Sequence, residues 1–315
     1  MTALQPLEDR PMATAARRVT LLRSHLSHNP GFFYARALVQ AGVILEDRPF
    51  DPRRQPPPTP LPESDLLLVC DSGVLMDMPA VRAHQGRKEF LAIDAHHKLD
   101  QHQAYAMAHG FDRVWVSQPQ VADEFQGRGA WLPVAADPDY HSFRPALAAG
   151  ESWWRRIRYR SYYDVGLCAA RYQHRQDFEK LFRHAGLTTN FHYGTRFLTA
   201  ATREVARCTI GFNVAAGFVP HGQKKFIGRD VNMRIFETMA NGQAMLLTNV
   251  WEGVGFEELF REGEEFVGYR TAEEAVEKTR HYAAHTEEAA AIARAGQRVI
   301  LERHTYLHRC RTLLA

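Results

Sequence analysis

Three polar side chains of one short helical segment could bind a phosphorylated ligand. Residues 228–249 read as a helix that opens after Asp230 and continues into a buried strand. Arg234 and Glu237 are three residues apart and share one face of this helix, while Asn232 falls in its first turn, where free backbone N–H groups attract phosphate. The spacing indicates a site for a diphosphate and a ribose; the alternative is a surface ion pair between Arg234 and Glu237.

The segment IDAHH offers a second kind of chemistry, proton transfer. Asp94 and His96 follow a buried apolar run and are two residues apart, so alternation along an extended strand end would aim both side chains to one side. The carboxylate could orient the imidazole, which would bind or deprotonate a hydroxyl group. The alternatives are a polar strand end in which Asp94 caps a helix, and a zinc site from His96, His97 and His102, for which HHKLDQH supplies no cysteine or acid at a familiar spacing.

Two further groups stand at expected strand ends in the second half of the chain. Arg171 and Arg175 follow the apolar run 164–170, and a bound anion would explain cations in a first helical turn, where the helix dipole disfavours them. Tyr193 and Gly194 end another strand, where the glycine lets a base or ribose approach the backbone and the tyrosine can stack on it. Solvated arginines and an ordinary turn glycine are the alternatives.

These residues need a scaffold, and the sequence alternates apolar runs with helical stretches. Six short apolar runs in the first half are separated by connections long enough for parallel crossovers. They cover residues 19–24, 43–50, 65–73, 88–97, 112–118 and 129–137. A second alternating series begins at residue 164. We therefore expect an α/β fold with two Rossmann-like domains that bind ligands in the cleft between them.

The length of 315 residues also favours two domains. We expect a loosely ordered N-terminus over residues 1–17, an N-terminal Rossmann-like domain over 18–145, a C-terminal Rossmann-like domain over 146–303 and a last helix over 304–315. The boundary near residue 145 marks a change to proline and then to mixed basic and aromatic residues.

Composition excludes several classes of protein. Hydrophobic residues make up 45% and charged residues 24%, which is typical of a core-forming chain, and the net charge of +3 is too small to demand a nucleic acid or an anionic membrane. The four cysteines form no CxxC pair, so neither a thiolate zinc site nor a disulfide framework is indicated. We expect a cytoplasmic protein with no export signal and no membrane span.

The second half resembles a known family of enzymes. Residues 228–249, 256–285 and 291–309, the last ending in HTYLHR, are similar to the C-terminal domain of CgeB-like glycosyltransferases, which have the GT-B fold. The similarity extends upstream through 163–186 and 190–194, and more weakly through IDAHH, so that it covers most of residues 65–309.

The resemblance implies a hexosyltransferase-like enzyme. Its C-terminal domain would bind the donor, a nucleotide sugar and most simply a UDP-sugar, and its N-terminal domain would bind the acceptor. The resemblance further implies that Glu237 holds the nucleotide ribose and that Arg175 faces the cleft and binds phosphate. Retaining GT-B families carry a second acid eight residues before this glutamate, whereas this chain has Arg229 there, which puts the contact of that acid with the donor sugar in doubt.

The resemblance bears on two further segments. Asn29–Pro30–Gly31 is similar to the small-residue loop that GT-B enzymes place beside the donor diphosphate, so Gly31 joins the candidate donor residues, and the last helix is expected to return to the N-terminal domain. The resemblance also implies transfer without a metal ion, because GT-B enzymes mostly work without a divalent ion, and we expect no cofactor. The lack of GxGxxG disfavours a nicotinamide enzyme.

Two other functions stay open on the sequence. Arg229 in place of an acid suits a catalytically silent GT-B scaffold that binds a nucleotide sugar or a partner protein. Residues 151–163 interleave aromatics with arginines, which suits an interdomain helix but also a glycosyltransferase whose acceptor is a modified base in DNA. For a transferase the acceptor is a hydroxyl-bearing molecule whose class the sequence does not name.

Overall fold

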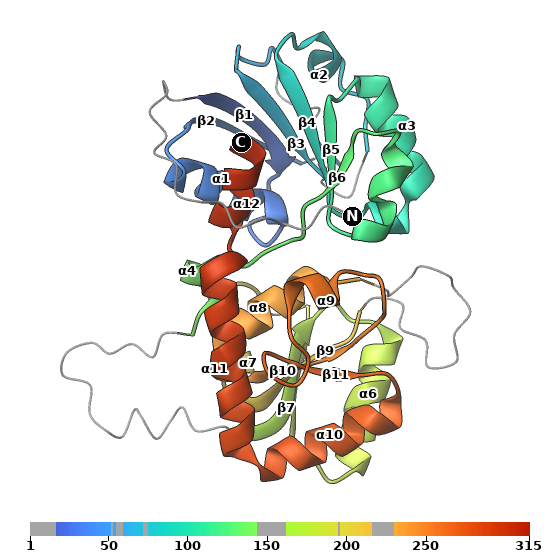
Figure 1. Ribbon diagram of the computed structural model, residues 1–315, viewed down its shortest axis with the longest axis vertical. Coiled ribbons are helices and arrows are strands. Elements are labelled where there is room, and N and C mark those ends of the chain that lie inside the picture. The colour runs from blue at the N-terminus through green and yellow to red at the C-terminus, as the bar shows by residue number, and fades with distance from the viewer. Residues whose placement is uncertain are drawn as a thin grey trace, which may run out of the picture.

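The computed structural model describes residues 17–51, 53–54, 59–71, 75–143, 162–194, 196–215 and 230–315. In these residues the chain forms two α/β domains, one above the other along the long axis of the molecule (Figure 1). The expected boundary near residue 145, the residue Arg229 and nearly all of the basic and aromatic stretch 151–163 lie outside the described residues.

The N-terminal domain is built on a six-stranded parallel sheet in the order β2-β1-β3-β4-β5-β6. Its central strands are buried on both faces: Leu21 and Leu68 pack in one core with α1, while Leu22 and Leu67 pack in the other core with α3. The elements are β1 (Arg18–Ser24), α1 (Pro30–Gln40), β2 (Ile44–Phe50), β3 (Leu66–Cys70), α2 (Pro79–Ala83), β4 (Arg87–Ala92), η1 (Ala95–His97), α3 (Leu99–His109), β5 (Arg113–Val116), η2 (Pro119–Phe125), β6 (Gly129–Trp131) and α4 (Pro138–His141).

The C-terminal domain has a five-stranded parallel sheet in the order β11-β10-β9-β7-β8. Its elements are β7 (Tyr163–Ala169), α6 (Gln173–His184), β8 (Thr189–Tyr193), α7 (Thr199–Val205), β9 (Cys208–Asn213), α8 (Met233–Asn241), β10 (Met245–Asn249), α9 (Phe256–Leu259), β11 (Val267–Tyr269), α10 (Ala272–Ala284) and α11 (Thr286–Arg303). Aromatic rings of α6 and of the strands fill the core beneath the sheet, with Phe178 lying 5.0 Å from Phe212 between ring centroids.

The last helix, α12 (Tyr306–Leu314), follows α11 in the chain but packs beside α1 in the N-terminal domain (Figure 1). Cys310 and Leu313 are fully buried in the core that α1 shares with β1 and β3. The guanidinium of Arg309, also buried, donates from Nε to the carbonyl oxygen of Pro133 at 2.7 Å. The described chain therefore returns from α11 of the C-terminal domain to the N-terminal domain through α12.

The two expected strands that bear on the site are shorter than their apolar runs. The run 88–97 yields β4 only as far as Ala92, after which the chain turns into η1, and the run 129–137 yields only the three residues of β6. All four cysteines are free and buried. None of the helices in the described part of the chain combines the length and the apolar character needed to cross a membrane.

Candidate functional site

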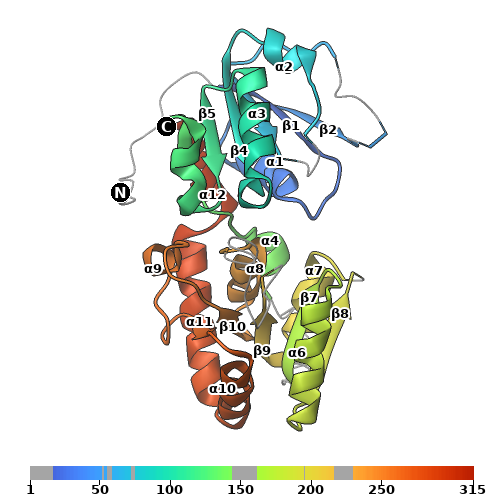
Figure 2. The ribbon, with the colours of Figure 1, turned by 90° about the vertical axis from the view of Figure 1, so that its right-hand side faces the viewer.

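A cavity of about 550 Å³ lies between the two domains, a volume that suits a small-molecule ligand. Its walls include residues that directly follow β4, β5, β7 and β8, so the carboxyl ends of strands from both sheets border it. Figure 2 shows the two domains that contribute these strands. The polar side chains on the walls belong to His28, Asn29, Asp94, His96, Ser117, Gln118, His141, Arg196, Thr202, Asp230, Asn232, Arg234, Glu237, Thr238 and Asn241.

Helix α8 supplies the lower wall, and its sequence explains its placement. Ile235 and Phe236 are fully buried against the C-terminal core, so the opposite face of the helix is left to the cleft. Asn232 is the N-cap, and its side chain accepts a hydrogen bond from the backbone N–H of Arg234 at 3.1 Å. The sequence predicted that the helix opens after Asp230 with Asn232 in its first turn, whereas the helix begins two residues later, after Asn232.

The predicted pair of Arg234 and Glu237 lines the cavity without forming an ion pair in the described part of the chain. Arg234 instead donates from Nε to the carbonyl oxygen of Cys168 at the end of β7, over 2.7 Å. This bond fixes the stem of the side chain, and the other guanidinium nitrogens remain for an anion. The alternative role as a simple surface ion pair is therefore not observed.

Glu237 faces a histidine that the sequence analysis missed. His141 of α4 is buried, and its Nδ1 accepts a hydrogen bond from the backbone N–H of Asp137 at 2.9 Å. Its proton must then sit on Nε2, which lies 3.5 Å from Oε1 of Glu237. Burial lowers the pKa of His141, so the ring is neutral at neutral pH. The side chain of Glu237 is about one quarter exposed and lines the cavity.

His96 lies in the upper wall and faces the opposite domain. Nε2 of His96 lies 3.6 Å from Oδ2 of Asp230, and both side chains are buried. No hydrogen bond joins Asp94 to His96 among the described residues, because β4 ends before Asp94 and the chain turns into η1, which breaks the strand alternation used in the prediction. The carboxylate beside the imidazole is therefore that of Asp230 and not that of Asp94. Asp94 precedes η1 but its side chain makes no capping hydrogen bond.

Asp94 borders the cleft in a crowded, acidic environment. Its carboxyl group is open to the cavity but has protein atoms on most other sides, and this burial, followed by repulsion from Asp71, raises its pKa above the ordinary value. Asp71 itself is buried and accepts a hydrogen bond from Nε2 of His102 at 2.8 Å. His102 is thus engaged inside the N-terminal domain, and the zinc site considered for His96, His97 and His102 does not form.

Arg175 lies behind the cleft wall and does not line the cavity. It is 3% exposed, and its guanidinium donates to the carbonyl oxygens of Ala170 and Val214 at 2.8 and 3.2 Å. Burial, with a smaller contribution from the nearby Arg234, lowers its pKa to about 10, so it remains charged at neutral pH. Arg171 is exposed and donates to Oε1 of Gln176.

The three remaining predicted donor residues divide between the cavity and the packing around it. Gly194 lines the cavity and has a φ of +68°, which glycine adopts readily. Tyr193 turns away, because its hydroxyl donates to Oε2 of Glu179 on α6 at 2.9 Å. Gly31 serves packing, since a Cβ there would lie 2.8 Å from Cβ of Arg23 on β1. The cavity instead receives Asn29 from the same loop.

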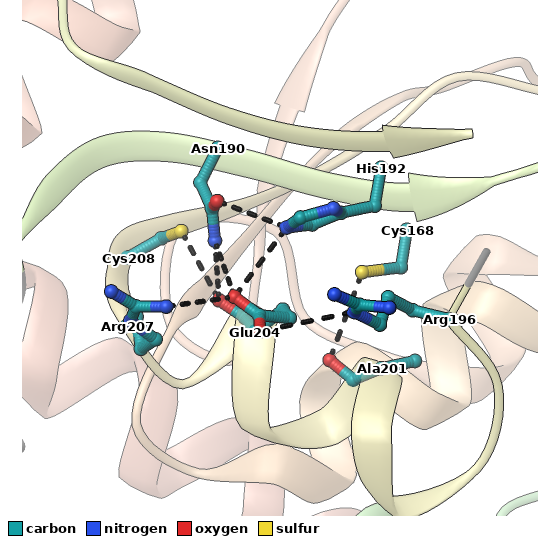
Figure 3. Close-up of polar contacts among 8 residues, drawn as sticks. All are labelled: Cys168, Asn190, His192, Arg196, Ala201, Glu204, Arg207 and Cys208. Atoms are coloured by element: carbon teal, nitrogen blue, oxygen red, sulfur yellow. Dashed lines mark hydrogen bonds and ion pairs between the residues drawn. The ribbon is translucent and has the colours of Figure 1, made fainter.

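Arg196 is a second cleft arginine that sequence analysis did not select. Figure 3 shows that Glu204 of α7 holds this region together: its carboxylate lies 3.1 Å from Nη1 of Arg207 and 4.0 Å from Nε of Arg196, and it accepts from Nδ2 of Asn190 at 3.3 Å. Arg196 therefore lies at the cavity edge with its position set by α7. The sequence could have indicated Arg196, because it follows Gly194, at the end of a predicted strand, by two residues.

The comparisons with known proteins agree with this architecture. Residues 190–315 match the model of a family described as glycosyl transferase-like. Anabaena HepE in complex with UDP-glucose superposes with a TM-score of 0.56 at 12% identity, covering 95% of this chain and 99% of the other. The fold is GT-B.

Two other solved structures give the same result. A glycosyltransferase from Rickettsia africae has a TM-score of 0.59 at 10% identity, with 96% of this chain and 97% of that chain covered. Sucrose-phosphate synthase from Thermosynechococcus elongatus has a TM-score of 0.58 at 11% identity, with 94% and 97% covered. No curated protein sequence matches the chain. The predicted fold class, α/β with two Rossmann-like domains in the GT-B arrangement, is confirmed.

Proposed function

We propose that the protein is a glycosyltransferase that moves a sugar from a nucleoside diphosphate sugar to a hydroxyl group. The observation that carries the proposal is one cavity with two chemically different walls: Arg234 and Glu237 from the C-terminal domain face it, as does His96 from the N-terminal domain. The family match over residues 190–315 and the GT-B fold support the same class. Within that class we propose a hexosyltransferase of the CgeB-like type with a UDP-sugar donor.

The lower wall has the features that a leaving diphosphate needs. The N-terminus of α8 directs the positive end of its dipole toward the cavity wall, and Arg234 belongs to the first turn of the same helix. Arg196 supplies a second positive charge on the cavity wall. Both charges would stabilise the phosphate oxygens as the bond to the sugar breaks, so we propose a reaction that requires no metal ion. Glu237 would accept hydrogen bonds from the ribose hydroxyls.

The upper wall has the features of a general base. In the proposed reaction the acceptor oxygen forms a bond with the anomeric carbon, the bond from that carbon to the diphosphate oxygen breaks, and His96 takes the hydroxyl proton. Asp230 at 3.6 Å would stabilise the imidazolium that results. Because His96 and Asp230 belong to different domains, this pair would form only when the cleft is as closed as it is here.

Mass spectrometry tests the proposal on the purified protein with a panel of UDP-, GDP- and dTDP-sugars. We expect slow hydrolysis of one donor without an acceptor, and transfer when a suitable hydroxyl compound is added from a panel that includes DNA with modified bases. Binding of a nucleotide sugar with neither hydrolysis nor transfer would indicate a catalytically silent scaffold instead.

A further inference from the structure

Two adjacent histidines and an aspartate from the opposite domain come together where the domains meet. His96 and His97 lie in η1, with ring centroids 3.9 Å apart, and Asp230 directly precedes the segment that leads into α8. A ring nitrogen of His96, a ring nitrogen of His97 and a carboxylate oxygen of Asp230 lie within 4.8 Å of one another. The nitrogen of His96 and the oxygen of Asp230 are 3.6 Å apart, close to the roughly 3.4 Å that separates two ligands of a tetrahedral zinc ion.

Three buried polar atoms of this cluster lack hydrogen-bond partners among the described residues, which is unusual for buried groups. The side chain of His96 is 2% exposed, and among the described residues neither of its ring nitrogens has a hydrogen-bond partner. Oδ1 of the buried Asp230 is in the same state. Leaving buried donors and acceptors unpaired costs free energy, so a ligand that satisfies them would bind favourably.

Asp230 is held at this place by a contact between the domains. The backbone N–H of Val231 donates to Oε1 of Gln118 at 3.2 Å, and this bond is buried. Gln118 lies two residues after the end of β5, the strand beside β4, so the segment that carries Asp230 is anchored against the same sheet edge that carries η1. The cluster is therefore built from both domains and does not depend on a single flexible loop.

We propose that His96, His97 and Asp230 bind a divalent transition metal ion of the zinc type and that the ion bridges the two domains. Two imidazoles and one carboxylate form a donor set that Zn²⁺ accepts, and the fourth position would be left to water. His97 is the exposed member on the solvent side, so the ion can enter without unfolding of either domain.

Such an ion would inhibit the transferase, a consequence that rests on the proposed function. A metal on His96 occupies the nitrogen lone pair that must accept the proton of the acceptor hydroxyl. Bound Zn²⁺ would also hold the cleft closed and impede exchange of nucleotide. His96 and Asp230 would then support transfer without metal and no longer do so when the ion is bound, whereas His97 would serve only to bind the ion.

Calorimetric titration of Zn²⁺ into the metal-free full chain, without nucleotide, tests binding directly. We expect one site per chain, an affinity at least about tenfold weaker in His97→Ala and in Asp230→Asn, and no change in His281→Ala. The last variant is the matched control, because His281 and His285 are exposed on or beside α10, with stacked rings, and could chelate an ion adventitiously. Loss of the site in His281→Ala with retention in His97→Ala would overturn the proposal, as would no saturable binding.

A second measurement separates this inference from the proposed function. If transfer is detected, Zn²⁺ should inhibit the wild type and have a much weaker effect on His97→Ala, whose transfer rate without metal should match the wild type. Equal inhibition of both proteins would overturn the inhibitory role. If no transfer is detected with any donor, the proposed function fails while the calorimetric result still decides whether the metal site exists.

Discussion

The two walls of the cleft differ in how their polar groups are satisfied. On the C-terminal side, Asn232 accepts a bond from the backbone of α8 and Arg234 donates to the carbonyl oxygen of Cys168. On the N-terminal side, His96 is buried with both ring nitrogens unpaired in the described part of the chain, and Asp94 has a raised pKa. Asn232 and Arg234 of the C-terminal wall are internally bonded, whereas His96, together with Asp230 opposite it, keeps unused capacity for protons or ligands.

This difference suggests that the two walls have different roles in the reaction. Bonded side chains keep their positions when the cleft is empty, so the C-terminal wall is preorganised for an anion and binding there needs little reordering. The unpaired imidazole of the N-terminal wall gains its partner only from a ligand, a proton or the opposite domain. Variants of the first wall should therefore weaken donor binding or the stabilisation of the leaving diphosphate, and variants of the second should impair proton transfer.

The largest effect is expected at His96. We expect His96→Ala to lower the transfer rate by about 10²–10⁴-fold, the usual contribution of a general base, while affinity for the nucleoside diphosphate stays within about twofold. Steady-state rates together with calorimetry on the same preparation measure both. A variant that transfers sugar at the wild-type rate would remove His96 from the mechanism and leave the upper wall without a base.

The next effect is expected at Arg234, with Arg175 as its buried counterpart. Arg234→Gln should lower turnover by about 10²-fold, because it loses a charge aimed at the leaving group, with little change in melting temperature. Arg175→Gln should mainly lower the melting temperature, because its guanidinium binds two backbone carbonyls inside the domain. If Arg175→Gln left stability unchanged but removed nucleotide binding, the original expectation that both arginines bind the diphosphate would be restored.

A smaller effect is expected at Glu237. Glu237→Ala should weaken binding of the nucleoside diphosphate by about tenfold, since hydrogen bonds to a charged group contribute about 1.5 kcal/mol or more. The decisive control is the 2′,3′-dideoxy nucleotide, which cannot donate to the carboxylate and should bind equally to both proteins. An equal loss of affinity for the dideoxy compound would assign Glu237 to the positioning of His141 rather than to the ribose.

Much of the architecture was predictable because parallel sheets leave a strong signal. Each buried strand appears in the sequence as a short apolar run. Apolar runs that alternate with helical connections indicate a parallel sheet, and this alternation predicts the fold class. The helix around residues 233–241 and its cleft-facing Arg234 and Glu237 were found because three-residue spacing fixes a shared helix face. Local periodicity suffices for such pairs.

The other contacts of the site could not be predicted, because sequence periodicity does not give the distance between side chains that are far apart in the chain. His141 reaches Glu237, and Asp230 reaches His96, only through the packing of one domain against the other. Arg175 and Tyr193 were assigned to the cleft because they stand near strand ends, yet hydrogen bonds turn both inward. A strand-end position selects the correct edge of the sheet, but whether the side chain faces the ligand or the domain interior depends on tertiary partners.

The smallest effect is expected at Asp94, and its direction follows from its raised pKa. Because the folded state holds this proton more tightly than the unfolded state, stability falls as the pH rises from about 4, the unfolded value, through the higher folded value. Asp94→Asn removes that cost and should raise the melting temperature at pH 7 by about 1–2 °C, a small shift because the group faces cleft water. The difference should vanish below about pH 3, where Asp94 is protonated in both states. A lower melting temperature at pH 7 would instead mean that the ionised carboxylate is stabilised in the folded protein, in which case the upper wall is as internally bonded as the lower one.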